Sequence, residues 1–370
     1  MKTIKPLNIE ELLERTPIKI NTDLIKNDLE GKVILVTGGA GSIGQEIVKQ
    51  AAEFTPQLIV ILDQSELMLY DQEVFLNRNF PTLNFIIELA DISNKGRMEL
   101  IFKKYKLDII FHAAAYKQVP LIERNPYEAI RVNILGTKIL ADLSLKNAIN
   151  KFVLISTDKA VNPTSVMGAS KRVAEMYIQS LQNESHAKTQ FITTRFGNVL
   201  GSNGSVIPLF QKQISQGGPL TLTHKEVNRY FMMISEACQL VLQAGTMGKG
   251  GEIYLFDMGD PVKILDLAEK MIRLSGLIPY EDIDIDVIGL RPGEKLYEEL
   301  LNNSSIMKAT HHPKIMITTV PSENFHKISI QIDEIINISN YKDSNEIVKV
   351  LKRLVPEYVS ENSPYKKLDK

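Results

Sequence analysis

The sequence predicts an α/β fold, a doubly wound parallel sheet with a smaller C-terminal α/β lobe. Short runs rich in β-branched residues alternate with segments of helical spacing, and this alternation is typical of a parallel sheet with helices on both faces. A glycine-rich turn directly follows the first run. The smaller lobe is predicted because the alternation becomes irregular after residue 196, with Gly and Pro clusters in 201–208 and 217–219.

Each expected strand is a short, mostly apolar run. The runs cover residues 33–36, 58–62, 85–89, 109–111, 152–155 and 191–194. Most of the segments between them have helical spacing: Ile43, Ile47 and Ala51 share one helix face, and 127–146 repeats isoleucines at near-helical intervals. Residues 226–260 are expected to return to the sheet as a helix and a strand.

Composition and charge exclude several classes of protein. A chain of 370 residues with 44% hydrophobic residues can bury a sizeable core, and a net charge of −1 without a basic stripe argues against a nucleic-acid partner. The single Cys238 excludes internal disulfides and cysteine-rich metal sites, and His311 and His312 lack a third ligand, so no metal site is predicted. No apolar run reaches the length of a membrane span and the N-terminus lacks a signal-peptide core, so a cytoplasmic chain is expected.

The glycine-rich turn predicts a dinucleotide site of the Rossmann type. Gly38, Gly41 and Gly44 let the backbone turn tightly and approach a pyrophosphate, while the following helix offers free N–H groups to the anion. Asp63 follows about 20 residues later, where a carboxylate can accept hydrogen bonds from an adenosine ribose. That carboxylate would repel a 2′-phosphate, so NAD is favoured over NADP. The glycines could instead form a plain strand-to-helix turn without a ligand. Asp63 could instead simply begin a turn.

Other expected cofactor contacts follow the carboxyl ends of the strands or lie near them. They are Ser42, Ile43, Ser65, Asp91, Ile92, Ala113, Ala114, Ala115, Tyr116, Asn133 and Lys171. The three alanines are small enough to let the cofactor backbone approach closely. His112, just before them, is better explained as a hydrogen-bonded core histidine than as a ligand.

An unusual residue stands in the expected catalytic segment. Met167 and Lys171 have the spacing of the Tyr-x-x-x-Lys pair of short-chain dehydrogenases, but a thioether cannot transfer a proton. Either the chain binds nucleotide without catalysis, or the proton chemistry has moved to Thr157, Asp158 and Lys159. Conversely, Asp158 and Lys159 could form a purely structural salt bridge.

Six ordered blocks resemble one family. They are residues 38–44, 112–120, 156–163, 167–171, 195–199 and 289–295. Together they look like the polysaccharide-biosynthesis branch of the extended short-chain dehydrogenases, which contains the UDP-N-acetylglucosamine 4,6-dehydratases, and in which methionine at position 167 is an ordinary variant. The leader 9–31 also resembles the segment before the fold in longer members, which carry membrane helices ahead of it. The resemblance implies either a naturally short form or the soluble part of a membrane-anchored protein.

The resemblance implies a role for each residue of the catalytic segment. Asp158 would be the acid for the C6 hydroxyl and Lys159 the base at C5, while Thr157 would bond the C4 oxygen. Lys171 would bind the nicotinamide ribose, and Met167 would be a bystander. In model peptides Asp titrates at about 3.9 and Lys at about 10.4, so the acid needs a raised pKa and the base a lowered one. Burial shifts both pKa values in those directions, whereas an ion pair shifts both the other way.

The same resemblance implies substrate contacts, whereas the division of the chain follows from its hydrophobic pattern. Asn198, Arg229, Arg291 and Glu294 match positions that contact a nucleotide diphosphate and ribose, and Lys117 is a weaker candidate, although either arginine could be a solvated surface residue. The expected units are an N-terminal arm at 1–30, an NAD-binding domain at 31–196 with 226–260, and a nucleotide-sugar lobe at 197–225 and 261–370.

The leading hypothesis is therefore 4,6-dehydration of UDP-N-acetylglucosamine for surface-glycan synthesis. A nucleotide-sugar 4-epimerase and an inactive NAD-binding regulator are the alternatives. The expected partners are a UDP-sugar and further copies of the chain, at least a homodimer formed through 127–146 and 170–182.

Overall fold

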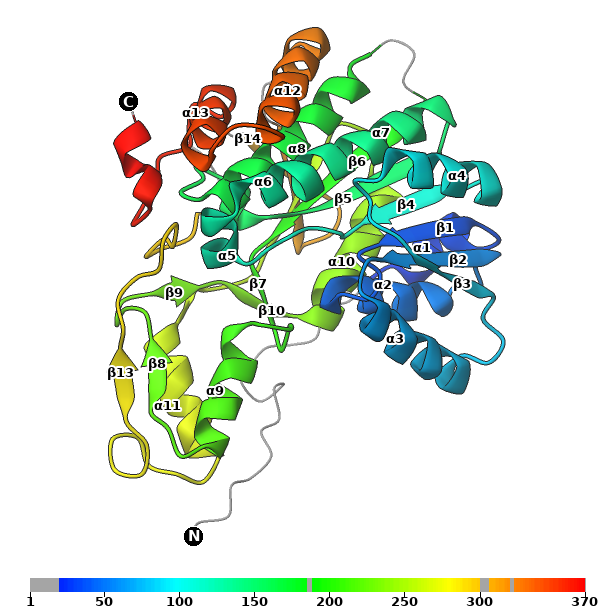
Figure 1. The fold of residues 1–370 in the computed structure, drawn as a ribbon. Coiled ribbons are helices and arrows are strands. Elements are labelled where there is room, and N and C mark those ends of the chain that lie inside the picture. Colours follow the sequence, from blue (N-terminus) through cyan, green and yellow to red (C-terminus); the bar gives the residue numbers. More distant parts are fainter. Residues whose placement is uncertain (1–19, 185–187, 300–305, 320–322, 370) are drawn as a thin grey trace.

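The computed structural model describes residues 20–184, 188–299, 306–319 and 323–369. Its centre is a nine-stranded sheet (Figure 1). In spatial order the strands are β14 (Ile306–Ala309), β15 (Ile315–Thr319), β11 (Ile253–Phe256), β6 (Gln190–Phe196), β5 (Lys151–Thr157), β4 (Ile109–His112), β1 (Val33–Thr37), β2 (Leu58–Asp63) and β3 (Phe85–Leu89). The strands from β3 to β11 run parallel, and β15 and β14 add an antiparallel hairpin at one edge. The α/β fold and all six expected strands are confirmed.

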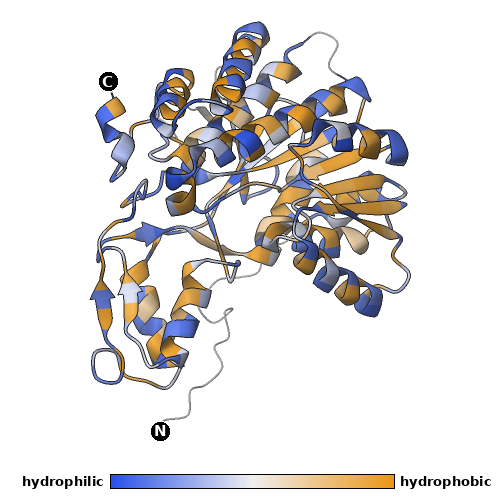
Figure 2. Ribbon diagram, viewed as in Figure 1, coloured by the Kyte–Doolittle hydropathy of each residue, from blue (hydrophilic) through white to orange (hydrophobic). Residues whose placement is uncertain are grey.

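Alternating side chains of the strands feed two separate cores, as the pleat of a strand requires. Leu35 of β1 belongs to the core under α4 (Lys95–Tyr105), α7 (Thr137–Lys146) and α8 (Val166–Gln182). Its neighbour Ile34 belongs to the core under α2 (Ser42–Ala52), α3 (Glu66–Asn79) and α10 (Ile234–Met247). Figure 2 shows the strands of the sheet as predominantly hydrophobic and the outer helix faces as more hydrophilic. Both faces are therefore covered, which explains why the strands read as continuous apolar runs.

The smaller lobe has its own core. It contains α9 (Val206–Ser215) and α11 (Ile264–Leu274) packed on the parallel pair β8 (Leu220–Leu222) and β13 (Ile285–Val287). Two short pairs join the lobes: β7 (Asn198–Leu200) with β10 (Phe231–Met233), and β9 (Asn228–Arg229) with β12 (Val262–Lys263). Figure 1 shows this lobe beside the carboxyl ends of the central strands.

The expected extent of the smaller lobe is wrong at the C-terminal end. The hairpin β14–β15 extends the central sheet, and α12 (Phe325–Ser339) and α13 (Ser344–Leu354) pack on α8. The reason lies in the isoleucines Ile328, Ile332 and Ile335, which occupy one face of α12 and are buried in the core of the main domain. The described residues from 306 onward thus belong to the main domain.

The same helices contradict the expected dimer interface. Almost every residue of α8 is buried within the single chain, and α12 and α13 cover it. The segment before it, expected as one helix over 127–146, consists of α6 (Pro126–Glu128), a π-helical stretch Ala129–Gly136 and α7, and α12 also contacts the π-helical stretch. Because these surfaces are already packed, they do not offer the face predicted to bind a second copy. Assembly itself stays a prediction.

The N-terminal arm is described only from residue 20, so most of the expected 1–30 unit lies outside the described residues. Helix α1 (Thr22–Leu29) packs on α10 and buries Ile25 and Leu29 in the main core. Among the described residues, no helix combines the length and the apolar character that crossing a membrane requires.

Candidate active site

The glycine-rich turn forms a cradle at the carboxyl end of β1. Gly38 has φ +64°, and a Cβ there would lie 2.5 Å from the backbone nitrogen of Ala114. A Cβ on Gly44 would lie 2.1 Å from the carbonyl oxygen of Gly38. Only glycine fits either position, because the contacted atoms are backbone atoms that cannot move aside. Three of the predicted features, the glycines, the alanines after β4 and the end of β2, therefore meet in one cleft.

The cleft is lined by most of the residues predicted to bind the cofactor. These are Gly38, Gly41, Asp63, Asp91, Ile92, Ala113, Ala114, Ala115 and Tyr116. Asp63 accepts hydrogen bonds from the backbone N–H groups of Ala40 (3.1 Å) and Ser65 (3.0 Å), which fix its carboxylate at the end of β2. Ser65 thus orients Asp63 and does not itself line the cleft. Ser42 accepts a hydrogen bond from the Asn203 N–H at 3.1 Å, which ties a loop of the smaller lobe to the glycine turn.

Asp91, which was predicted to contact the cofactor, has hydrogen-bond partners within the protein. Asp91 bonds both the N–H and the hydroxyl of Ser93 at 2.8 Å and pairs with Arg131. Burial alone would raise the pKa of Asp91, but these hydrogen bonds and the Arg131 charge hold it below its ordinary value. Its carboxylate lines the cleft with both oxygens already engaged.

Asn133 does not line the cleft, and its contact with the cofactor stays a prediction. It lies in the π-helical stretch and is buried, with its amide oxygen accepting from the Tyr116 N–H at 2.8 Å. Its amide nitrogen donates to the Tyr116 carbonyl (3.1 Å) and to the Ser170 hydroxyl (2.9 Å). The wider helical turn thus places the Asn133 side chain where it holds the backbone after β4.

His112 is a core histidine, as expected: it bonds the hydroxyls of Thr37 (2.7 Å) and Thr137 (2.9 Å).

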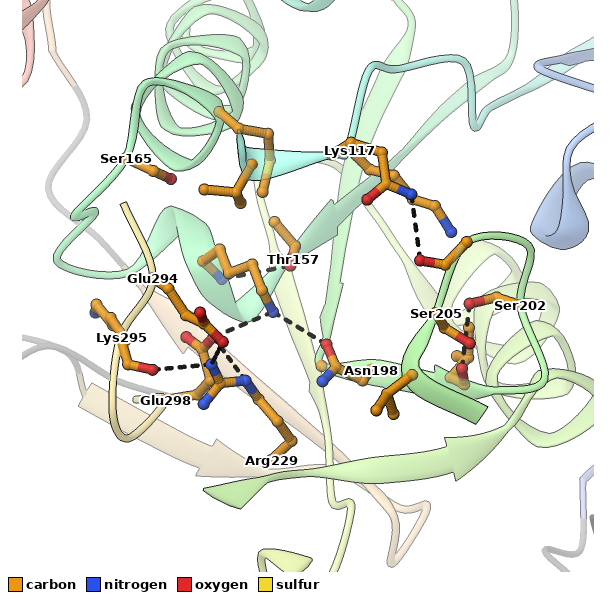
Figure 3. Close-up of a pocket in the computed structure, with 18 of the residues that line it drawn as sticks. Lys117, Thr157, Ser165, Asn198, Ser202, Ser205, Arg229, Glu294, Lys295 and Glu298 are labelled. Atoms are coloured by element: carbon orange, nitrogen blue, oxygen red, sulfur yellow. Dashed lines mark hydrogen bonds and ion pairs between the residues drawn. The ribbon is translucent and has the colours of Figure 1, made fainter. Parts of the chain in front are cut away.

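A larger cavity of about 420 Å³ lies between the lobes. Thr157 and Lys159 from the end of β5, Met167 and Lys171 from α8, and Ile43 from the glycine turn line its main-domain side. Lys117, Asn198, Arg229, Arg291 and Glu294 line it as well, so the structure brings together every residue predicted to bind substrate. Figure 3 shows the side chains of Thr157, Asn198, Arg229 and Glu298 converging from different elements.

Asp158 lies behind Thr157 and Lys159 and does not line the cavity. Its side chain is 1% exposed, and its Oδ1 accepts from the Thr157 hydroxyl (2.8 Å) and the Lys159 ammonium (3.0 Å). The other oxygen, Oδ2, is buried without a hydrogen-bond partner and lies where a Cβ on Gly197 would come within 2.7 Å. Thr157 therefore stands between the acid and the cavity.

The two lysines of the site have opposite environments. Lys159 Nζ lies 3.0 Å from Asp158 Oδ1, 3.1 Å from Asn198 Oδ1 and 3.3 Å from Glu298 Oε1. Burial lowers its pKa, but the Asp158 and Glu298 charges outweigh burial and raise the pKa above its ordinary value. The expected lowering of the Lys159 pKa is therefore wrong, because the sequence did not reveal Glu298 as a second carboxylate partner.

Lys171 is the lysine with a lowered pKa. Its Nζ donates to the Ile155 carbonyl at 2.8 Å, and burial lowers its pKa to about 8 against a smaller opposing effect of Glu175. Glu175 is itself held by Arg195, whose Nε lies 2.7 Å from it, and by the Ser156 hydroxyl at 2.7 Å. Through the bond to Ser156, this buried Glu175–Arg195 pair holds the carboxyl end of β5 in place.

Arg229, expected to contact the nucleotide diphosphate or ribose, has several partners within the protein. Its guanidinium donates to the carbonyls of Asn228 (2.7 Å) and Lys295 (2.8 Å) and lies 3.3 Å from Glu294 and 3.6 Å from Glu298. These partners occupy most of its donors, so its role as a diphosphate contact is not supported.

Arg291 and Lys117 remain as cations at the cavity. Arg291 is exposed, and its backbone N–H donates to Glu294 at 3.0 Å. Burial and the nearby Lys159 lower the pKa of Lys117. The remaining oxygen of Glu294 accepts from the Thr223 hydroxyl at 3.0 Å.

Glu298 is the functional candidate that sequence reasoning missed. It is only four residues beyond Glu294, but the segment carries several glutamates, and nothing in their spacing marks the one that turns inward. Its side chain is 2% exposed and pairs with both Lys159 and Arg229. Glu298 differs from the exposed Glu299 because its side chain is buried and has two cationic partners.

A parallel sheet, a glycine cradle at its switch point and a buried lysine on α8, the helix that comes after β5, define a short-chain dehydrogenase/reductase of the extended type. Residues 34–320 match the model of the family described as polysaccharide biosynthesis protein, and the chain belongs to that family.

Three curated relatives show the range of this family. The capsular polysaccharide biosynthesis protein CapD of Staphylococcus aureus is 48% identical over 355 residues, which cover 95% of this chain and 58% of CapD. A UDP-N-acetylglucosamine 4,6-dehydratase (inverting) of Campylobacter jejuni is 32% identical, covering 82% of this chain and 84% of that protein. A UDP-glucose 4-epimerase of Rickettsia canadensis is 35% identical, covering 75% and 80%. The chain thus spans little more than half of CapD.

A solved structure agrees with the fold. The X-ray structure of Pen from Bacillus thuringiensis superposes with a TM-score of 0.72 at 33% sequence identity, covering 80% of this chain and 92% of Pen.

Proposed function

We propose that the protein catalyses the NAD-dependent 4,6-dehydration of UDP-N-acetylglucosamine to a UDP-4-keto-6-deoxy sugar for surface-glycan synthesis. At the coarser level, similarity to dehydratases and epimerases supports a nucleotide-sugar-modifying enzyme. The observation that carries the finer proposal is the Thr157–Asp158–Lys159 group, in which a hydroxyl and an amine at the cavity each donate a hydrogen bond to the carboxylate behind them.

The residues present fit a nicotinamide dinucleotide. A pyrophosphate would lie at the glycine turn, at the N-terminus of α2, and the Asp63 carboxylate that lines the cleft would accept hydrogen bonds from an adenosine ribose and repel a 2′-phosphate. Lys171, buried beside the same cavity, would bind the nicotinamide ribose. When bound, the cofactor supplies the acceptor and later the donor of a hydride.

The dehydration needs one group to take the C5 proton and another to protonate the departing C6 hydroxyl. Moving a single proton from Lys159 to Asp158, across 3.0 Å, produces a neutral amine and a protonated carboxyl group together. The amine faces the cavity directly, and the carboxyl proton can reach it through the Thr157 hydroxyl, 2.8 Å away. One internal proton transfer therefore creates the acid and the base that the reaction requires.

The epimerase remains the second candidate, because a UDP-glucose 4-epimerase is among the relatives. The purified chain, incubated with UDP-N-acetylglucosamine and NAD, distinguishes the candidates by mass spectrometry and proton NMR. A product lighter by one water supports the dehydratase, and an isomer of unchanged mass supports the epimerase. Binding without any conversion would leave the inactive regulator.

A further inference from the structure

Lys159 stands in a buried cluster of charged groups contributed by several elements. The groups that face it are Asp158 beside it in the chain, Glu298 from the segment after β13, Arg229 from β9 and Lys117 from the segment after β4. Neutral Asn198 of β7 completes the contacts of its Nζ. Figure 3 shows Glu298 beside Arg229.

Glu298 is held between the two cations. Its Oε1 lies 3.3 Å from Lys159 Nζ and 3.6 Å from Arg229 Nε, and its Oε2 is buried without a hydrogen-bond partner. Its negative charge is therefore balanced mainly by Lys159 and Arg229. At 2% exposure this charge is poorly screened, so it acts strongly on both neighbours.

The balance of charge in the cluster gives Glu298 a specific task. Asp158 and Glu298 balance Lys159 and Arg229, so the four groups are neutral together. If the Lys159 proton moves to Asp158, the remaining pair of Glu298 and Arg229 is still neutral. Without Glu298, Arg229 would keep Glu294 as a partner at 3.3 Å, whereas Lys159 would keep only Asp158 as a carboxylate partner, so the Arg229 charge would act on Lys159 with less compensation.

We propose that Glu298 is a positioning residue that holds Lys159 at the sugar cavity and controls when Lys159 releases its proton. The importance of this control for turnover depends on the function proposed above, but the control itself does not. The Glu298 charge favours the ammonium form of Lys159 and the Arg229 charge disfavours it. Removing only the Glu298 charge must therefore make Lys159 lose its proton at lower pH.

The direct test is NMR of protein labelled at the lysine ε-carbon, with Lys159→Arg used to assign the signal. In the wild type the Lys159 signal should leave its charged position only at a pH above that of ordinary lysines. In Glu298→Gln it should titrate at a pH lower by one unit or more. Glu299→Gln, which removes the same charge from an exposed neighbour, should behave as the wild type. An unchanged titration in Glu298→Gln would overturn the proposal.

A second variant covers the case in which Glu298→Gln fails to fold. Glu298→Asp keeps the charge but moves it away by one methylene, so it should give a smaller shift in the same direction, and no shift would count against the proposal. In the folded variants, the low-pH limb of kcat for UDP-N-acetylglucosamine should also move to lower pH, with KM changed less than kcat. If the wild type converts no substrate, the proposed function fails, while the NMR titration still decides the role of Glu298.

Discussion

At the scale of single residues, the site is organised by the contrast between its two lysines. Lys159 contacts two carboxylates and keeps its proton, whereas Lys171 contacts a carbonyl oxygen and has a pKa of about 8. The sequence predicted both positions. It did not predict which lysine would be easier to deprotonate, because that depends on Glu298, which is brought to the site by a different lobe.

The lowered pKa of Lys171 predicts a pH-dependent cost to stability. Between about pH 8 and 10.5 the unfolded chain binds the Lys171 proton and the folded chain does not, so stability due to this group rises with pH across that window. Relative to Lys171→Met, the unfolding free energy of the wild type should therefore gain about 3 kcal/mol from pH 7.5 to 10.5, as 1.36 kcal/mol per pKa unit implies. Urea unfolding at several pH values measures this difference. A constant difference would show that Lys171 is not desolvated.

Met167 provides the second prediction at this scale. It lines the cavity and is 3% exposed, and its thioether has no proton to transfer. Met167→Leu keeps the volume and apolar character, so most of the turnover should survive, with a stability loss below about 1.5 kcal/mol. Steady-state rates with the nucleotide sugar test this. A complete loss of turnover in a folded variant would give Met167 a direct part in the reaction.

At the scale of elements, the turn between β1 and α2 is the part that the sequence predicted best. Glycine spacing depends on local backbone sterics, and the cradle against Ala114 follows from it. The π-helical stretch Ala129–Gly136 was not predictable in the same way, because apolar spacing does not distinguish a π turn from an α turn. Within that stretch, the Asn133 side chain holds the Tyr116 backbone.

Gly38→Ala tests the cradle. The substitution combines a strained positive φ with a Cβ 2.5 Å from the Ala114 backbone, so the affinity for NAD should fall at least tenfold. Gly217→Ala is the matched control, since Gly217 also has a positive φ of +87° but no atom within 4 Å of its added Cβ. Calorimetric titration with NAD should show the loss only in Gly38→Ala. Equal affinities in both variants would place the cofactor elsewhere.

At the scale of the whole molecule, the sequence predicted a doubly wound parallel sheet but not where the C-terminal segment packs. The sequence indicates that one face of α12 is apolar, but it does not indicate which lobe that face packs against, because both lobes offer apolar surfaces. The structure packs α12 and α13 on α8, and this placement also removes the face expected for dimerisation. Long-range packing of this kind depends on competition between surfaces, which local patterns do not record.

Ile332→Ala tests whether α12 is an integral part of the main core. Ile332 is fully buried on the face that meets the main domain, so truncation should cost about 2–5 kcal/mol of unfolding free energy. Ile330→Ala, on the exposed side of the same helix, should cost far less. Chemical denaturation of both variants gives the comparison. Similar small losses would mean that α12 is only loosely attached.

The central claim is that Lys159 exchanges a proton with C5 of the sugar. The most direct measurement is the turnover of UDP-N-acetylglucosamine in deuterium oxide, followed by proton NMR of the product for the wild type and for Lys159→Met. The account predicts a 4-keto-6-deoxy product that carries solvent deuterium at C5 in the wild type and no C5 exchange in the variant. A dehydrated product that retains its original C5 hydrogen, or undiminished exchange in Lys159→Met, would contradict it.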